Sequence, residues 1–142
     1  RKSRAVFTDN YRVLFEDYSE RHYAKAFKKN YGNQWLVTRK ALVAQFAHID
    51  QLVLNGRTNP PIHRTDDNKE WIIKHEFVIA GRKQSAKDSG NRVILYVNHN
   101  DRTVRVLLLY HKGYLGKSAS ETATWRGIIK QEFKDLLTRF SL

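Results

Sequence analysis

The segment from Thr103 to Tyr110, with the sequence TVRVLLLY, constrains the fold more than any other part of the chain. Its section from Val104 to Leu109 is almost entirely apolar, which is the pattern of a strand that is buried on both faces. The polar sequence Asn-His-Asn-Asp at residues 98–101 comes just before it and indicates a turn. The sequence therefore predicts a sheet with this strand near its centre.

Two further apolar segments precede this strand. Glu70–Ala80 is rich in Trp, Ile, Val and Phe, and Val93–Val97 consists only of Val, Ile, Leu and Tyr. Between them, Gly81–Gly90 is polar and basic, as expected of a turn or a long hairpin loop. The three segments together predict an antiparallel meander.

Helical spacing of apolar residues marks the chain before the sheet. Tyr23, Phe27 and Tyr31 recur at this spacing, with Ser19 as the candidate N-cap and Gly32 at the end. A second helix is indicated by an apolar stripe that consists of Trp35, Leu42, Val43, Phe46, Ile49 and Val53. Because only Gly32 and Asn33 separate the two helices, we expect an antiparallel helical hairpin.

The remaining segments complete the predicted order. Ala5–Leu14 is a candidate short strand, and Asn55–Lys69, which contains Pro60-Pro61, is a candidate loop. After the sheet, Ser118 and Glu121 have the spacing of a capping box. The helix that follows has a buried stripe of Trp125, Ile128, Ile129, Phe133, Leu136 and Leu137. The sequence thus predicts one α+β domain over residues 1–142, with a small antiparallel sheet, an N-terminal helical hairpin and a C-terminal helix.

Charge is the strongest signal for function. The chain has 26 Lys and Arg residues against 14 Asp and Glu, a net charge of +12. Residues 21–49 contain no acidic residue, and Tyr23 and Tyr31 lie among their basic residues. Cations with interspersed aromatic rings suit RNA, because phosphates meet the charges and bases stack on the rings. Equally, the rings can belong to the core and the charges to a solvated helix face.

Absent residue types narrow the range of functions. The chain has no Cys, so disulfides, thiolate metal sites and Cys nucleophiles are excluded. The six His residues do not form the His-x-x-x-His spacing of a zinc helix, and we expect no metal or other cofactor. No apolar segment reaches the roughly 20 residues that span a bilayer. We therefore expect a cytoplasmic protein without a membrane partner.

Three local sequences resemble the RelE/ParE superfamily of toxins. Ser89–Val97, SGNRVILYV, resembles the Gly-x-Arg opening of a strand in RelE-type toxins, although Asn91 stands where an aromatic residue is usual. Val106–Lys112 resembles the next strand, an apolar run that ends in basic residues. Trp71–His75 resembles the strand before, which carries Lys or His toward the active cleft. The resemblance covers roughly residues 70–133.

This resemblance implies a RelE-like fold of order β-α-α-β-β-β-α and the activity of an mRNA interferase in a type II toxin–antitoxin system. Such an endoribonuclease cleaves mRNA, commonly on the ribosome. The RNA 2′-hydroxyl attacks the neighbouring phosphate without a metal, leaving a 2′,3′-cyclic phosphate and a 5′-hydroxyl. The implied partners are mRNA, the ribosome and a cognate antitoxin protein that is acidic.

The resemblance also assigns roles to residues of the implied cleft. Arg92 would stabilise the phosphate, and His111 and Lys112 would protonate the leaving group and stabilise charge. Either His75 or Lys74 would be the base, because neighbouring strand residues face opposite ways. His75 is favoured, since a Lys base needs a strongly lowered pKa. The candidates for RNA binding are Lys74, Arg82, Lys83 and Tyr114.

Two alternatives remain open. ParE-like members share this fold and poison gyrase without a cationic nuclease site, whereas the set of Lys74, His75, Arg92, His111 and Lys112 favours the nuclease branch. A non-enzymatic basic module that binds RNA or DNA would explain the net charge equally well.

Overall fold

The computed structural model describes residues 10–115 and 120–140, and it has an α+β fold built on one five-stranded sheet. The strand order is β1-β5-β4-β3-β2. The strands are β1 (Arg12–Phe15), β2 (His63–Arg64), β3 (Glu70–Glu76), β4 (Asn91–Asn98) and β5 (Thr103–His111). Strand β1 pairs with β5 in parallel and the other neighbours are antiparallel, so the sheet is mixed rather than wholly antiparallel.

The apolar strand and the meander are confirmed. Strands β3, β4 and β5 are consecutive and antiparallel, and in β5 every residue from Val106 to Tyr110 is buried. The strand expected over Glu70–Ala80 ends earlier, at Glu76. The chain then leaves the sheet toward a helix, where the backbone N–H of Ala80 donates to Thr38 Oγ1 at 2.8 Å.

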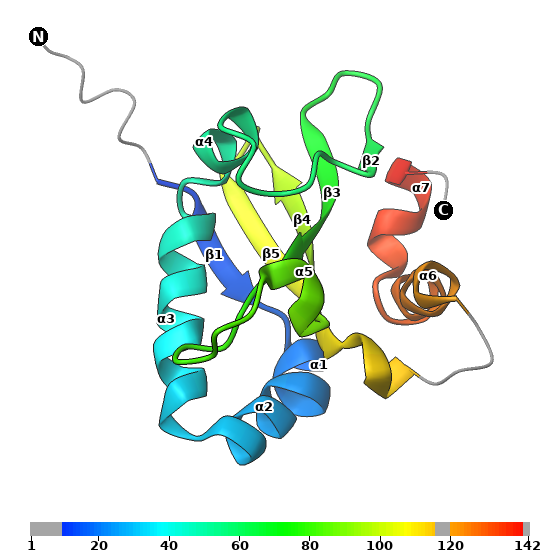
Figure 1. Cartoon of the computed structure of the whole chain (residues 1–142). Coiled ribbons are helices and arrows are strands. Elements are labelled where there is room, and N and C mark those ends of the chain that lie inside the picture. Colours follow the sequence, from blue (N-terminus) through cyan, green and yellow to red (C-terminus); the bar gives the residue numbers. More distant parts are fainter. Residues whose placement is uncertain (1–9, 116–119, 141–142) are drawn as a thin grey trace, which may run out of the picture.

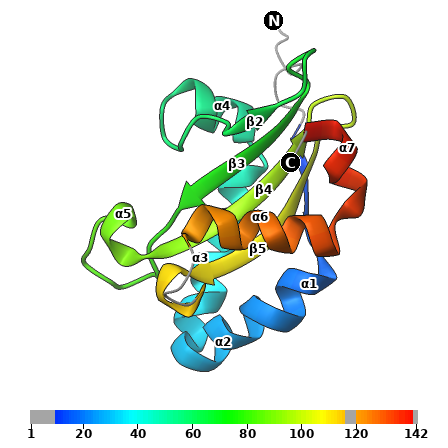
Figure 2. The same cartoon turned by 90° about the vertical axis from the view of Figure 1, so that its right-hand side faces the viewer.

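Helices cover both faces of the sheet. Helix α3 (Asn33–Phe46) lies on one face, and α6 (Glu121–Glu132) and α7 (Leu137–Phe140) lie on the other (Figures 1 and 2). Each face has its own apolar core. Trp35 and Phe46 belong to the core on the α3 side, and Trp125 and Ile129 to the core on the α6 side. In Figure 2, α6 crosses in front of the sheet.

The expected helical hairpin is present, with a different start. Its first arm is a continuous run of α1 (Asp17–Ser19), the π-helical η2 (Glu20–Ala24) and α2 (Lys25–Tyr31). Ser19 is not the N-cap: it lies inside the first turn and its hydroxyl donates to Glu16 O at 3.1 Å. Contacts between the arms are a Glu20–Arg39 ion pair of 2.5 Å and ring packing of Phe27 on Trp35.

Several short elements differ from the sequence expectations. The predicted second helix is divided into α3 and α4 (Ile49–Leu54) because His48, with φ −121° and ψ 41°, is not helical. The two expected loops contain β2 and α5 (Ala86–Ser89). The strand expected over Ala5–Leu14 is observed as Arg12–Phe15, while residues 1–9 lie outside the described part. The 3-10 turns are η3 (Lys112–Leu115) and η4 (Lys134–Leu136).

The N-cap of α6 is Ser120, whose Oγ accepts the Ala123 backbone N–H at 3.1 Å. The expected capping residue, Ser118, lies outside the described residues. None of the helices in the described part is long and apolar enough to cross a membrane.

Candidate functional site

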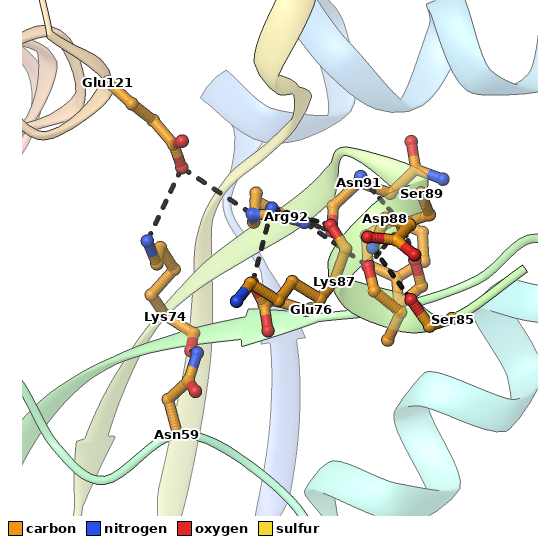
Figure 3. A network of polar contacts seen from close by, with 12 residues as sticks. Asn59, Lys74, Glu76, Ser85, Lys87, Asp88, Ser89, Asn91, Arg92 and Glu121 are labelled. Carbon is orange, nitrogen blue, oxygen red and sulfur yellow. Dashed lines mark hydrogen bonds and ion pairs between the residues drawn. The ribbon is translucent and has the colours of Figure 1, made fainter.

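Polar side chains converge on the α6 face of the sheet, where β3 ends and β4 begins. In register, Glu76 of β3 stands opposite Arg92 of β4, and Arg92 stands opposite Tyr110 of β5. Lys74 shares this face, because side chains two residues apart in a strand point the same way. Figure 3 shows Lys74, Glu76 and Arg92 grouped together, with Glu121 approaching from the start of α6. We call Lys74, Glu76, Arg92, Tyr110 and Glu121 the sheet-face cluster.

The guanidinium of Arg92 is held from several directions. Nη1 donates to Asn91 O at 3.1 Å, and Nη2 donates to Lys87 O, also at 3.1 Å. Nη2 also lies 3.3 Å from Glu76 Oε2. The side chain is only 6% exposed. Carbonyls and a carboxylate together compensate much of the cost of burying this charge.

Helix α5 places its carbonyls beside Arg92 because a side-chain hydrogen bond holds each of its ends. Ser85 caps the start, accepting the Asp88 backbone N–H at 3.0 Å. At the end, Ser89 Oγ donates to Phe77 O at 2.7 Å. Gly90 then reverses the chain with φ 79°, a conformation that glycine adopts without strain.

Glu121 joins the cluster from the first residue of α6. Its Oε2 accepts the Tyr110 hydroxyl at 2.6 Å, and it lies 3.7 Å from Lys74 Nζ and 3.8 Å from Arg92 Nε. Burial, followed by this hydrogen bond, raises the pKa of Tyr110, so the phenol is a proton donor. Arg92 Nε is buried without a hydrogen-bond partner among the described residues. A buried N–H without an acceptor is uncommon in folded proteins, so this group is a candidate for binding a ligand.

His75 lies on the opposite face from Arg92, so of the two candidate bases the structure brings Lys74, and not the favoured His75, to the face of Arg92. Its ring packs edge-on against Phe46 in the α3-side core, and its Nδ1 is 2.8 Å from Thr58 Oγ1. Burial lowers its pKa to about 4. The apolar neighbours Ile73 and Phe77 point the same way as His75, and their packing leaves Lys74 on the cluster's face.

The expected residues at the end of β5 are close in the chain to the cluster but are not part of it. Strand alternation directs His111 away from the face of Tyr110, and it stands opposite Asn91 in register. The backbone N–H of Gly113 donates to His111 Nδ1 at 3.0 Å. Lys112 is exposed.

Two of the remaining RNA-binding candidates lie away from the cluster. Arg82 and Lys83 are exposed, and the Arg82 guanidinium lies 5.3 Å from the ring centre of Tyr31. The side chain of Tyr114 lies outside the part of the chain whose side chains are described. Arg82 and Lys83 are therefore not part of the group around Arg92.

Sequence reasoning missed three members of the cluster: Glu76, Tyr110 and Glu121. Strand alternation was the signal for Glu76, because it stands two residues after Lys74. Nothing local indicated Glu121, which reaches the sheet only through the packing of α6. Among the described residues, no three His, Asp or Glu side chains gather as metal ligands would.

We compared the chain with known protein families, with curated proteins and with solved structures, and none of the three comparisons found a match.

Proposed function

We propose that this protein is an endoribonuclease that cleaves mRNA by metal-independent attack of the RNA 2′-hydroxyl. The observation that carries the proposal is the meeting of a carboxylate, a guanidinium and an ammonium on one sheet face, with Glu76 Oε2 3.3 Å from Arg92 Nη2. These groups can supply a base and charge stabilisation for a phosphorane. The α+β fold and the antiparallel meander are compatible with the RelE-like resemblance.

In this mechanism Glu76 takes the proton of the 2′-hydroxyl, and the 2′-oxygen bonds to phosphorus. Arg92 and Lys74 stabilise the charge that develops on the phosphorane oxygens. The bond from phosphorus to the 5′-oxygen then breaks, and this oxygen receives a proton from a donor at the end of β5. Tyr110 is the donor within the cluster, whereas His111 and Lys112, the donors that the resemblance implies, follow it in the chain and lie outside the cluster. The products are a 2′,3′-cyclic phosphate and a 5′-hydroxyl.

Substrate binding must displace Glu121, because its carboxylate is the present partner of the two cations. Its Oε2 lies 3.7 Å from Lys74 Nζ and 3.8 Å from Arg92 Nε. A phosphate oxygen would take its place and would also accept from the unsatisfied Arg92 Nε–H. The start of α6 thus competes with RNA for the same donors.

The partners we propose follow from charge. The net charge of +12 would attract the protein to the RNA phosphates of a ribosome. An acidic antitoxin would complement the same surface, and the cytoplasm is the compartment in which both would be met.

A second candidate function is non-enzymatic binding of RNA or DNA. One observation favours it: Arg92 is 6% exposed and already paired within the protein, so it is not presented to solvent as a phosphate clamp. In that case the sheet-face cluster stabilises the fold, and the exposed basic residues bind the nucleic acid.

The test is cleavage of mRNA on translating ribosomes, with the ends mapped by primer extension and their chemistry determined. We expect a 5′-hydroxyl and a 2′,3′-cyclic phosphate. Glu76→Gln should lower the rate about 100-fold, the scale of general base catalysis. Glu121→Gln should raise RNA affinity about fivefold, or about 1 kcal/mol, because it removes the competing charge.

The matched control is Glu132→Gln, which makes the same change at an exposed position of α6. It should leave both the rate and the affinity unchanged. Equal cleavage by Glu76→Gln and wild type would show that Glu76 is not the base. RNA binding without any cleavage on ribosomes would instead support the binding module.

A further inference from the structure

A separate pocket lies between the β2–β3 pair and helix α6. Its volume is about 240 Å³, which is room for several water molecules. It neighbours the sheet-face cluster through Lys74, which lines the pocket and also lies 3.7 Å from Glu121 Oε2. The residues that line it are Ile62, His63, Lys74, Thr122, Trp125 and Arg126.

The polar groups of this pocket are mostly donors. Lys74 and Arg126 are cations that can only donate, and no lining residue is a carboxylate. His63 packs its ring edge-on to Trp125. Burial, followed by the charge of Arg126, lowers the pKa of His63, so the ring is neutral at pH 7 and offers a single N–H.

Trp125 supplies the second, independent observation. Its side chain is 1% exposed, and its indole Nε1–H has no hydrogen-bond partner among the described residues. Buried polar groups are nearly always paired, and an exception indicates an absent partner. The nitrogen itself is closed to solvent, so an acceptor in the pocket reaches it only when the wall shifts.

A ligand that pairs with the donors of this pocket has several acceptor oxygens and a negative charge. A phosphate group meets both requirements, since it can accept from the ammonium and the guanidinium together. A neutral acceptor would bring no negative charge to a wall that carries two cations, and a cation would be repelled.

We propose that this pocket binds a phosphate group, and that in the working enzyme it is the phosphate of a nucleotide next to the one being cleaved. Lys74, shared by the pocket and the cluster, links the two positions. The assignment to RNA rests on the proposed ribonuclease function, whereas the binding of phosphate does not.

The first arm of the test uses inorganic phosphate and the three indole N–H signals in an NMR spectrum of the ¹⁵N-labelled protein. We expect a saturable shift of the Trp125 signal and no comparable shift for Trp35 and Trp71. Arg126→Gln should weaken the affinity at least fivefold, while Lys130→Gln, the same loss of charge at an exposed site on α6, should change it less than twofold. A Trp125 signal that does not respond, or equal affinities for Arg126→Gln and wild type, would overturn the phosphate site.

The second arm uses a short RNA with a 2′-deoxy sugar at the cleavage position, so that it binds without reacting. We expect it to shift the same Trp125 signal and to compete with inorganic phosphate. If phosphate shifts the signal and the RNA does not, the site for a neighbouring nucleotide is refuted. Loss of the proposed ribonuclease function would appear separately, as phosphate binding at Trp125 in a protein that cleaves no RNA on ribosomes.

Discussion

Lys74 and His75 are neighbours in the chain, yet their side chains have opposite environments. Lys74 Nζ lies 3.7 Å from the Glu121 carboxylate on the α6 face, whereas His75 is buried against Phe46 on the α3 face. The two faces follow from the pleat of β3, and the packing of the apolar residues decides which face each side chain takes. His75 is therefore a residue of the core, and its ionisation bears on stability rather than on chemistry.

We expect stability to depend on pH through His75. Burial lowers its pKa from 6.5 to about 4, so the folded protein binds this proton less readily than the unfolded chain. The contribution to the free energy of unfolding is complete above pH 6.5 and is lost as the pH falls toward 4, by about 3 kcal/mol. Urea denaturation at several pH values measures the loss, and His75→Asn, whose amide can still bond to Thr58, should lack it.

The comparison with the variant is necessary because burial also lowers the pKa of His63 and of His99. The wild type and His75→Asn both retain the contributions of His63 and His99 to the free energy of unfolding. The difference between their pH profiles is therefore the contribution of His75. Identical profiles would contradict the assignment of His75 to the core.

At the scale of elements, the sequence pattern predicted what depends on local periodicity. The three strands of the meander and the turn at Gly32 have strong local patterns and are confirmed. The last helix is confirmed only in part, because α6 ends at Glu132 and the expected stripe residues Phe133, Leu136 and Leu137 lie beyond it. The break between α3 and α4 occurs at a single residue and β2 has only two residues, so neither is long enough to produce a periodicity that indicates it. The same limit applies to the site. Arg92 was found because its strand carries a motif, whereas Glu121 reaches it from 29 positions away, through the packing of α6.

Two glycines test the local part of this argument. Gly32, between the arms of the hairpin, has φ 56° and ψ −126°, which strains any residue with a Cβ. Gly127 lies inside α6, and a Cβ there would meet nothing within 4 Å. We expect Gly32→Ala to lower the free energy of unfolding by about 1–3 kcal/mol and Gly127→Ala to raise it by about 0.5–1 kcal/mol.

Denaturant unfolding of both variants measures these changes. Each substitution adds one methyl group, so the pair controls for composition and only the backbone conformation differs. If the two variants were destabilised to the same extent, the positive φ of Gly32 would not be the reason why Gly32→Ala lowers the free energy of unfolding.

At the scale of the whole molecule, charge and chemistry lie in different places. In the sheet-face cluster two cations face two carboxylates, so the cluster adds little to the net charge of +12. Residues 21–49 have six Lys and Arg residues and no acidic residue. There η2, α2 and α3 form a groove that Arg21, Lys25, Lys28 and Arg39 line, together with Glu20, which pairs with Arg39. We therefore expect the hairpin groove, rather than the sheet-face cluster, to attract a polyanion at long range.

This separation predicts that the salt dependence of RNA binding can be changed without changing the chemical step. Each cation that contacts single-stranded RNA contributes about 0.7 to the slope of log K against log salt. Lys25→Gln with Lys28→Gln should make the slope shallower by about 1.4, measured by fluorescence anisotropy with a short RNA. Cleavage at saturating RNA should be unchanged, because neither Lys belongs to the sheet-face cluster.

The control for net charge is the pair Lys130→Gln and Lys134→Gln, which removes two exposed charges outside the groove. If position matters, this pair should leave the slope within about 0.3 of the wild-type value, less than half of one contact. If only the total charge matters, both pairs should change the slope equally, and the hairpin groove would then have no special role. A fall in cleavage rate for the Lys25 and Lys28 pair at saturation would show that capture and chemistry are not separate in this fold.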